Sequence, residues 1–257
     1  MQIRFEKYQG TGNDFIIIDN RQRTFPVSNE LIQQLCDRKF GIGSDGLILF
    51  EEDDASDFYM NFFNPDASKS FCGNGSRCIV KYAIQKGIIG ESCVFKAIDG
   101  LHEAKRNDNW IHIKMNNVNS YERKGLDYQV DTGSPHYIKM VENVDIININ
   151  AEAHRIRYSE EYQEKGINVN FVEHQFDKIK MRTYERGVEG ETLSCGTGVT
   201  ATVLAMAIEH NLDRDLDVNT KGGQLRVTFE RNEQEFKNIW LCGPAEKVYE
   251  GQIDVAR

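Results

Sequence analysis

The sequence lacks the features that define several broad classes of protein. Its 257 residues hold only six cysteines and no Cys-x-x-Cys spacing, which argues against a disulfide scaffold and against a zinc site. No apolar run approaches the roughly 20 residues that a membrane-spanning helix needs. The first residues contain no apolar segment typical of a secretory signal. We therefore expect a soluble, cytoplasmic protein without a bound metal.

Positive charge is also scarce. The chain has 31 Lys and Arg against 40 Asp and Glu, a net charge of -9. Nucleic acids and anionic membranes attract clustered Lys and Arg, so neither is expected as a partner. Hydrophobic residues make up 40% of the chain. The length and composition suit one large globular domain, or two of about 100–150 residues each.

The pattern of apolar residues predicts few helices and many strands. One helix is expected after the N-cap Ser28 and ends by Gly41, and two others span 75–86 and 198–210. The last of these is apolar on nearly all sides, so we expect it to be buried. Strands are expected at 3–8, 15–19, 47–50, 58–63, 94–97, 111–115, 137–141, 169–173, 179–184, 225–229 and 239–241. This content predicts an α+β fold.

Two short segments indicate an internal duplication. Cys72-Gly-Asn-Gly precedes one predicted helix, and Cys195-Gly-Thr-Gly precedes another about half a chain later. The sequence therefore suggests two similar halves. The polar stretch 116–124 is the best candidate for a linker between them.

The glycine motifs do not indicate a nucleotide site. Residues 41–46 match Gly-x-Gly-x-x-Gly, but they follow a helix and lead into a strand, whereas a dinucleotide fingerprint follows a strand and opens a helix. Residues 196–201 open a helix but lack the lysine of a phosphate-binding loop. No cofactor is expected.

Cys72 and Cys195 are the candidate reactive groups. A thiol at the start of a helix feels the positive end of the helix dipole and the nearby N–H groups, and both effects favour the thiolate. The glycines that follow allow the backbone N–H groups to approach a substrate carboxylate closely. Two such sulfurs, on opposite faces of one carbon, could remove a proton from one side and deliver another from the other. That is stereoinversion at a C–H bond without a cofactor.

The sequence resembles the diaminopimelate epimerases, a family of cofactor-independent amino-acid epimerases. The resemblance runs over nearly the whole chain, and the order and spacing of its motifs are specific. The matching stretches are 10–15, 36–46, 63–66, 71–78, 132–136, 168–171, 184–187, 191–198 and 243–245.

The resemblance implies two pseudo-symmetric α+β domains. Each would be a mixed β-sheet wrapped around a central helix, with the active site in the interdomain cleft. The N-terminal domain would span 1–117 and be completed by the C-terminal strands, about 245–257; the C-terminal domain would span 118–244. The family also implies a homodimer and a role in lysine and peptidoglycan-precursor biosynthesis.

The resemblance also assigns roles to residues. In the conversion of LL-2,6-diaminopimelate to meso-diaminopimelate, Cys195 would be the proton acceptor and Cys72 the proton donor, with His136 and Glu185 tuning the thiols. The residues implied in substrate binding are Asn13, Asn64, Gly73, Asn74, Asn168, Glu185, Arg186, Gly196 and Thr197. Arg186 suits the distal carboxylate because its planar fork can bind one bidentately.

Two positions depart from the family pattern. Many relatives carry Gln at the position of Gly46, and some carry Asn at that of Ser134. These departures leave the contacts at the distal end of the substrate open.

Three other functions compete with this interpretation. One is a degenerate module that binds an amino acid without turning it over, and the two intact cysteines argue against it. A proline or hydroxyproline racemase of the same superfamily usually carries His in place of Asn74 and has no need of the charged Arg186. A thiol redox protein, with Cys72 and Cys195 cycling through a disulfide, would also use low-pKa thiols. The glycine-lined anion cradles argue against the redox alternative, although an inactive disulfide-bonded state of the enzyme stays open.

Overall fold

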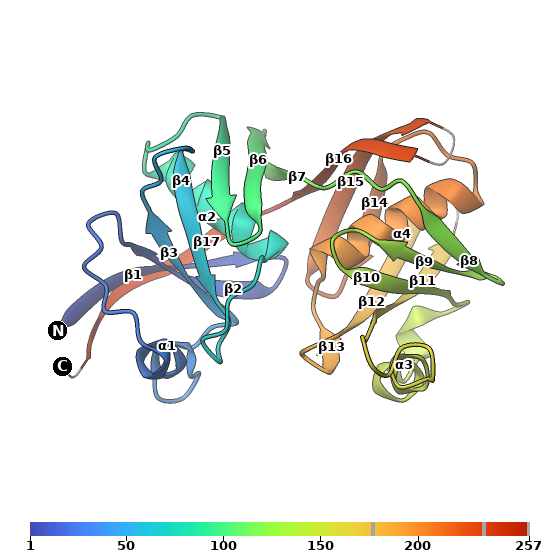
Figure 1. Ribbon diagram of the computed structural model, residues 1–257, viewed down its shortest axis with the longest axis horizontal. Helices are drawn as coiled ribbons and strands as arrows, with labels where there is room; N and C mark the ends of the chain where they lie inside the picture. Colours follow the sequence, from blue (N-terminus) through green and yellow to red (C-terminus); the bar gives the residue numbers. More distant parts are fainter. Residues whose placement is uncertain (176–177, 233–234, 256–257) are drawn as a thin grey trace. The chain divides into compact units, whose positions relative to one another are not determined.

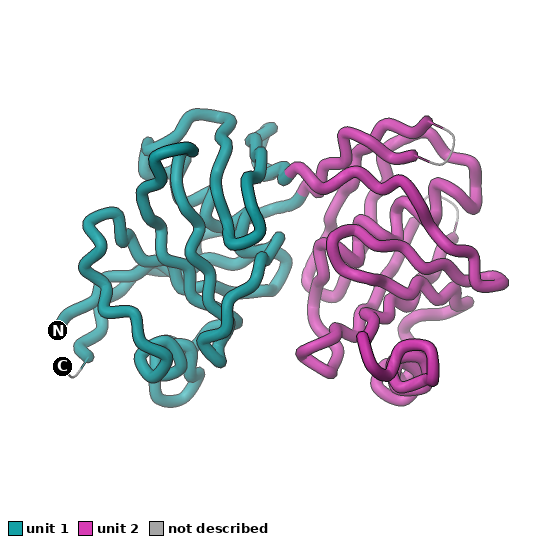
Figure 2. Tube along the Cα trace, viewed as in Figure 1, with its two compact units in different colours: residues 1–113, 243–257 teal, residues 114–242 magenta. Residues whose placement is uncertain are grey.

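The computed structural model describes residues 1–175, 178–232 and 235–255. The chain forms two compact units: unit 1 comprises Met1–Ile113 and Gly243–Arg257, and unit 2 comprises Lys114–Cys242 (Figure 2). The domain limits 117/118 and 244/245 stay a prediction, and residues 256–257 of the predicted N-terminal domain lie outside the described part of the chain.

Unit 1 is built from strands distributed over both ends of the chain (Figure 1). Its elements are β1 (Gln2–Gly10), β2 (Asn13–Asp19), α1 (Asn29–Cys36), β3 (Gly46–Glu51), β4 (Phe58–Phe63), α2 (Gly73–Gln85), β5 (Ser92–Ala97), β6 (Gly100–Asn107), β7 (Trp110–Lys114) and β17 (Glu246–Asp254). The last residue of β7 is assigned to unit 2. Antiparallel pairing of β1 with β17 brings the two ends of the chain side by side (Figure 1).

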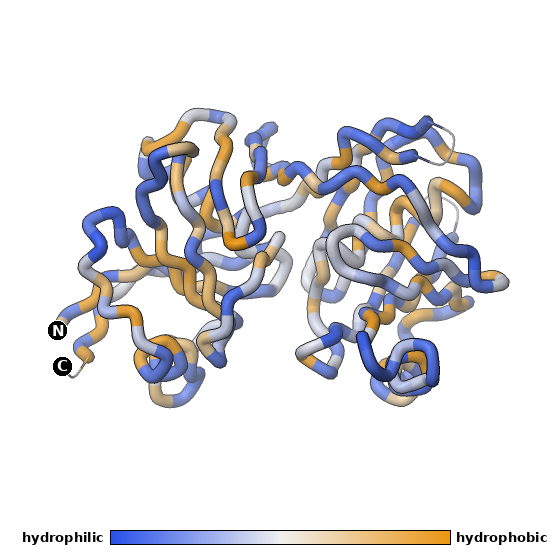
Figure 3. Tube along the Cα trace, in the orientation of Figure 1, coloured by the Kyte–Doolittle hydropathy of each residue, from blue (hydrophilic) through white to orange (hydrophobic). Residues whose placement is uncertain are grey.

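Helix α2 lies against the sheet of unit 1. From β17 through β1 to β7, neighbouring strands pair antiparallel, antiparallel, parallel, antiparallel, parallel, antiparallel and antiparallel. The helix contacts β1, β2, β3, β4 and β17. The segments β2 to β4 are strongly hydrophobic (Figure 3), and Phe15, Ile48 and Met60 pack in one core with Ile79 of the helix. This core fixes where the first turn of α2 lies.

Unit 2 has its own sheet and its own enclosed helix. Its elements are β8 (Tyr121–Lys124), β9 (Asp127–Asp131), β10 (Pro135–Met140), the 3-10 turn η1 (Val144–Ile146), α3 (Ile149–Arg157), β11 (Asn168–Gln175), β12 (Lys178–Glu185), β13 (Gly190–Thr192), α4 (Gly196–Glu209), β14 (Leu216–Thr220), β15 (Gly223–Asn232) and β16 (Glu235–Gly243). From β8 to β16, leaving out the short β13, the pairings follow the same series of directions as in unit 1.

Helix α4 is buried along almost its whole length, as its all-round apolar sequence predicts. It contacts β9, β10, β11, β14 and β15. Val199, Val203 and Met206 have no exposed surface and lie in one core with Val172 and Leu225 of the sheet. The helix start, where Cys195 lies, is therefore held rigidly by packing on several strands.

The structure confirms the predicted helices and strands to within a few residues. Helix α1 follows Ser28, whose Oγ accepts a hydrogen bond from the Leu31 amide at 3.2 Å. Helices α2 and α4 begin at Gly73 and Gly196, two residues earlier than expected. All eleven predicted strand segments fall on β-strands. Together with four α-helices in the described residues, this is a mixed α+β fold.

Some elements were missed, and one prediction was wrong. Helix α3 was not predicted because its apolar stripe is narrow, with only Ile149 and Ala153 buried. Strand β17, which only the family resemblance implied, is exposed or half-exposed at every position, so it lacks the apolar alternation of a half-buried strand. The stretch 116–124 is not a linker, because Val118 forms a bridge with Phe236 and residues 121–124 form β8.

Candidate active site

Cys72 is the N-cap residue of α2. Its backbone is extended, and its Sγ accepts a hydrogen bond from the Gly75 amide at 3.4 Å. The first N–H groups of a helix have no partner within the helix, and here they belong to Gly73, Asn74 and Gly75. The sulfur is half-buried beside this positive helix end. The arrangement provides a thiol next to backbone donors that can bind an anion.

A tight hairpin brings Asn13 to Cys72. Thr11 and Gly12, between β1 and β2, both have positive φ, as a two-residue type I′ turn requires. Asn13 Oδ1 lies 3.9 Å from Cys72 Sγ and accepts a hydrogen bond from Asn74 Nδ2 at 3.2 Å. An acceptor therefore faces the sulfur from β2.

A network of charges fixes the direction of the Asn13 amide. Asn13 Nδ2 donates to Asp45 Oδ2 at 2.7 Å, which leaves Oδ1 directed toward Cys72. Arg38 bridges Asp45 and Asp14, and Lys7 also pairs with Asp14. Burial alone would raise the pKa of Asp14. Hydrogen bonds from Arg38 and Lys7 outweigh this effect and lower the pKa to about 2. The loop 41–46 between α1 and β3 thus carries Asp45 to the site and is not a nucleotide-binding motif.

Asn64 lies directly after β4, in a loop that its own side chain holds together. Its Nδ2 donates to the Ser68 carbonyl at 3.2 Å, to Ser68 Oγ at 3.0 Å and to Ser70 Oγ at 3.1 Å. The side chain is half-buried. Its role in substrate binding stays a prediction.

Cys195 is the N-cap residue of α4, as Cys72 is of α2. Its backbone is extended and its side chain is buried. Sγ lies 3.5 Å from Thr197 Oγ1, and the Thr197 carbonyl accepts a hydrogen bond from Thr132 Oγ1 at 3.0 Å. Gly196 and Thr197 occupy the first two helical positions, so their N–H groups point out of the helix start.

Glu185 ends strand β12 and is hydrogen-bonded to Cys195. Thr192 Oγ1 donates to the same carboxylate across the β12–β13 pairing. Burial raises the pKa of Glu185, and the hydrogen bonds from Thr192 and Cys195 oppose that rise. A carboxylate in this position can accept the thiol proton.

His136 lies on β10 and reaches Cys195 through Thr197. Its Nε2 is 3.0 Å from Thr197 Oγ1, and its ring has no exposed surface. Burial, together with the charge of Arg186, lowers the pKa of His136 to about 3. The imidazole is therefore neutral at neutral pH.

Asn168 holds the loop before β10 to the end of β12. Its Nδ2 donates to Ser134 Oγ at 2.8 Å and to the Pro135 carbonyl at 3.0 Å, and its Oδ1 accepts from the Arg186 amide at 2.9 Å. Arg186 Nη1 donates to the Lys165 carbonyl at 3.0 Å. The arrangement links Ser134, one of the two unusual positions, directly to Asn168.

The other unusual position, Gly46, has no room for a side chain. A Cβ atom there would lie 2.3 Å from Phe62 Cε2 and 3.0 Å from the Phe63 carbonyl oxygen. The Phe62 ring packs edge-on against Phe15, with 6.0 Å between ring centroids. In this chain, then, the aromatic ring fills the space that a longer residue at position 46 would need.

We expect Gly46→Gln to destabilise unit 1 by about 1–3 kcal/mol, the usual cost of overpacking. In a Phe62→Ala background the same change should cost clearly less, because the ring that it displaces is gone. Denaturant unfolding of the four proteins measures the coupling. Gly90→Gln is the control, since a Cβ atom at Gly90 meets no atom within 4 Å. Equal costs in both backgrounds would contradict this account of Gly46.

The structure brings some of the predicted residues to the cysteine of each unit, whereas the side chains of Asn64, Asn168 and Arg186 bond other residues. In unit 1, Asn13, Asn74 and Gly73 surround Cys72; in unit 2, Glu185 and Thr197 contact Cys195, and His136 lies behind Thr197. Four further residues hold the site residues in place and were not predicted from the sequence: Asp45, Asn170, Thr183 and Thr192. One signal was available, because Asn168 and Asn170 alternate with Val169 and Phe171 in the strand and therefore share one face.

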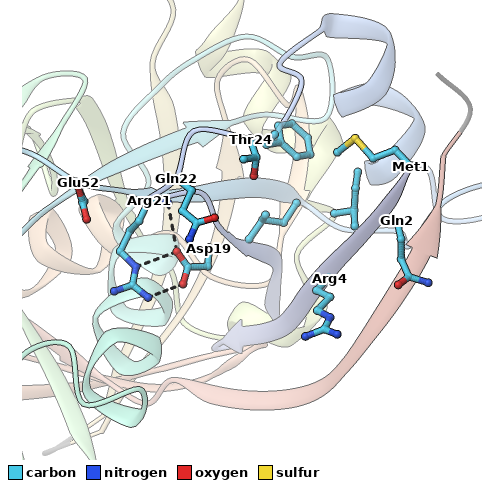
Figure 4. A pocket seen from close by; sticks show the side chains of 11 residues that line it. Met1, Gln2, Arg4, Asp19, Arg21, Gln22, Thr24 and Glu52 are labelled. Atoms are coloured by element: carbon cyan, nitrogen blue, oxygen red, sulfur yellow. Dashed lines mark hydrogen bonds and ion pairs between the residues drawn. The ribbon is translucent and has the colours of Figure 1, made fainter.

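Two hollows in unit 1 are lined by none of the predicted site residues. One, of about 620 Å³, is lined by Met1, Arg4, Asp19, Arg21 and neighbouring residues (Figure 4). Arg21 there already donates to both carboxylate oxygens of Asp19, from Nε and Nη2. We assign this hollow no part in catalysis, because no cysteine or histidine lines it. Among the described residues, no cluster of His, Cys, Asp and Glu could hold a metal ion, and no helix could cross a membrane.

Comparisons with known proteins identify relatives over the full chain. The family model described as diaminopimelate epimerase matches residues 5–120 and 128–248. A diaminopimelate epimerase of Flavobacterium psychrophilum is 48% identical over 257 residues, covering 98% of this chain and 100% of the relative. One of Aquifex aeolicus is 37% identical over 274 residues, covering 98% of both chains.

Solved structures share the fold at low sequence identity. A Bacillus anthracis phenazine biosynthesis protein of the PhzF family has a TM-score of 0.80 at 15% identity, covering 99% of this chain and all of the other. A hydroxyproline epimerase from Agrobacterium vitis has a TM-score of 0.68 at 14% identity, covering 98% of this chain and 92% of the other. These similarities show a shared mixed α+β fold and nothing beyond the fold.

Proposed function

Because the chain belongs to the diaminopimelate epimerase family, we propose that it is an isomerase that interconverts LL-2,6-diaminopimelate and meso-diaminopimelate with two cysteine thiols and no cofactor. In this role it serves lysine and peptidoglycan-precursor biosynthesis. One observation carries the proposal about the site. Each unit places a cysteine at the N-cap of an enclosed helix that begins with Gly-x-Gly.

The proposed reaction exchanges one proton for another at a single carbon. From the LL isomer, the Cys195 thiolate takes the α-proton, so the C–H bond breaks and an S–H bond forms. The Cys72 thiol then delivers its proton to the opposite face of the carbanion and is left as thiolate. In the reverse direction the two sulfurs exchange roles. No electrons are transferred, and the reaction needs no redox partner.

The helix starts would stabilise the negative charge that develops during this exchange. Gly73, Asn74, Gly196 and Thr197 occupy the first positions of α2 and α4, whose N–H groups have no partner within the helix. Donors held in place at the substrate carboxylate favour the carbanion electrostatically and need no reorganisation during the reaction. Two buried helices would supply these donors as fixed features of the fold.

The rest of the substrate needs groups for a second amino and a second carboxylate group. Arg186 suits the distal carboxylate, and Glu185 can accept from an ammonium. Asn13, Asn64 and Asn168 are the amides that we expect near them. Since Asn168 already bonds Ser134, Pro135 and the Arg186 amide, its contribution is chiefly to hold Arg186 in position.

The proposal requires two pseudo-symmetric domains, with the active site in the interdomain cleft. The identical series of strand directions in the two units supports the symmetry. A thiolate removes a proton from carbon efficiently only where water is excluded, so we expect the domains to close on the substrate.

We also propose a homodimer and a cytoplasmic location. Strand β17 exposes Val248 and Tyr249 to 57% and 44%, which would suit an interface with a second copy. A cytoplasmic location would suit an enzyme of amino-acid biosynthesis. Sedimentation velocity on the purified protein tests the dimer.

Proton exchange in D2O tests the proposed function. Metal-free, reduced protein is incubated with LL-diaminopimelate, and with L-proline in a parallel sample, and NMR follows the α-hydrogens. We expect deuterium to enter diaminopimelate together with formation of the meso isomer. Turnover of proline alone would place the chain among the proline racemases. No exchange with either compound, in folded and reduced protein, would leave the thiols a redox or binding role and contradict the proposal.

A further inference from the structure

A buried chain of polar side chains runs through unit 2 and ends at Cys195. Thr183 of β12, Asn170 of β11 and His136 of β10 follow one another, and Thr197 at the start of α4 completes the chain. Asn170 and His136 have no exposed surface, and Thr183 is 2% exposed. Asn170 and Thr183 therefore cannot touch a substrate, and their polarity needs another explanation.

Two hydrogen-bond partners determine the orientation of the Asn170 amide. Its Nδ2 lies 3.4 Å from the Tyr137 carbonyl oxygen, which can only accept a hydrogen bond. Its Oδ1 accepts from Thr183 Oγ1 at 3.0 Å. The second hydrogen on Nδ2 is then directed at His136 Nδ1, 3.0 Å away. Asn170 is thus a donor toward the imidazole.

This contact selects one tautomer of His136. Since Nδ1 accepts from Asn170, the ring proton must be on Nε2. The ring stays neutral at neutral pH because burial lowers the pKa of His136 to about 3. Nε2–H therefore donates to Thr197 Oγ1 at 3.0 Å.

The direction of the last hydrogen bond follows from the others. Thr197 Oγ1 already accepts from His136, so its own hydrogen is free to point at Cys195 Sγ, 3.5 Å away. A hydrogen bond donated to a thiolate stabilises the charged form and lowers the pKa of the thiol. We propose that Asn170 is a positioning residue, which fixes the tautomer of His136 and so directs the Thr197 hydroxyl to stabilise the Cys195 thiolate.

Close packing holds this chain in register with the helix. A Cβ atom on Gly198 would lie 2.5 Å from Asn170 Oδ1 and 3.3 Å from two ring atoms of His136. The first turn of α4 can rest on both side chains only because residue 198 is a glycine. The packing of α4 on the sheet therefore fixes the positions of Asn170, His136 and Thr197 relative to one another.

Two charged groups near this chain act separately on the thiol and on the ring. Glu185, from the end of β12, is hydrogen-bonded to Cys195, and as long as it is ionised its charge favours the neutral thiol. Arg186, the next residue, disfavours protonation of His136. The Thr197 hydroxyl opposes Glu185, so the proposal predicts a definite change when the hydroxyl is removed or redirected.

The test titrates the Cys195 thiol without substrate. Thiolate absorbance near 240 nm is followed against pH, and the curve of the matching Cys195→Ala protein is subtracted. Thr197→Val, which removes the hydroxyl, should raise the Cys195 pKa by about one unit, as expected for one hydrogen bond to a charged group. Asn170→Leu, which removes the donor to His136 at similar volume, should raise it by a similar amount. Thr197→Ser keeps the hydroxyl and should leave the pKa within a few tenths of a unit.

The double variant separates the proposed chain from a general disturbance. In the Thr197→Val background, Asn170→Leu should produce no further change, because the hydroxyl that it acts through is absent. Nitrogen-15 NMR of the histidine ring, assigned with His136→Gln, should show Nε2 protonated and Nδ1 bare in the unsubstituted protein. If Asn170→Leu does not fold, the spectrum still tests the tautomer of His136, and the Thr197→Val titration still tests the effect of the hydroxyl on Cys195.

Three results would overturn the inference: a proton on Nδ1 of His136, an unchanged Cys195 pKa in Thr197→Val, or additive shifts in the double variant. The inference concerns how Cys195 would be tuned for the proposed function, yet its readout involves no turnover. A shifted thiol pKa in a protein that fails the D2O experiment would therefore reject the proposed function alone.

Discussion

Replacing Cys195 by alanine is expected to lower epimerisation at least about 10³-fold in both directions, within the range for loss of a general acid or base. Cys72→Ala should have an effect of the same size. Each proposed reaction cycle uses both sulfurs once, so removing either one leaves a carbanion without a donor or a substrate without a base. The meso isomer formed from LL-diaminopimelate over time, measured by NMR, gives the loss directly.

The two variants should differ in the exchange that remains. Without Cys195, Cys72 can still remove and return the proton at the D centre of meso-diaminopimelate, and in D2O it washes in deuterium with retention. Without Cys72, Cys195 should do the same at the L centres of the LL isomer. The site of residual labelling thus reports which face each thiol serves. Labelling at the opposite centres would reverse the assigned roles of donor and acceptor.

Cys93→Ala provides the matched control. This thiol is buried on β5, and burial raises its pKa to about 12, so it has no thiolate at neutral pH. The substitution makes the same change of side chain without touching either helix start. Activity within about twofold of the unsubstituted protein is expected. A loss as large as that of Cys195→Ala would show that any lost thiol disables the fold.

The parts of the site that the sequence predicted are those encoded locally. A cysteine followed by Gly-x-Gly and an apolar helix is a continuous segment, and its geometry follows from helix capping alone. The strands around it also have local patterns, such as the apolar run of β3. This is why both helix starts were predicted to within two residues and most of the central strands were predicted correctly.

The parts that escaped prediction depend on strand register and packing between distant segments. Asn170 meets His136 only because β11 runs parallel to β10, and it meets Thr183 because β12 runs antiparallel to β11. Phe62 fills the space beside Gly46 because β4 pairs with β3. No spacing within a single segment encodes such contacts. Strand β17 was expected only through the family resemblance, since its exposed side chains give no apolar pattern at all.

Glu185→Gln is expected to lower kcat/KM at least about 10²-fold, because the amide cannot take the proton of Cys195. The side chain keeps its size and can still accept a hydrogen bond from Thr192. Glu191→Gln is the matched control on the adjacent strand. Glu191 is paired with Arg182 at 2.6 Å, and its pKa is lowered by that guanidinium. The control variant should retain most of the activity.

The stability of the two variants separates a catalytic effect from a structural one. Burial raises the pKa of Glu185 in the folded protein, so folding is favoured below the unfolded pKa and loses that contribution as pH rises through the folded pKa. At pH 7 a neutral glutamine avoids this cost, and the free energy of unfolding of Glu185→Gln should equal or exceed that of the unsubstituted protein. Glu191, with its pKa lowered, contributes stability at pH 7, so Glu191→Gln should be the less stable variant.

The pH dependence of kcat/KM completes the test of Glu185. In the unsubstituted protein, protonation of Glu185 should remove the acceptor for the thiol proton, so the rate should fall as pH decreases through its raised pKa. This acidic limb should disappear in Glu185→Gln and remain in Glu191→Gln. An acidic limb that persists unchanged in Glu185→Gln, or activity within fivefold of the unsubstituted protein, would mean that Cys195 loses its proton to another group.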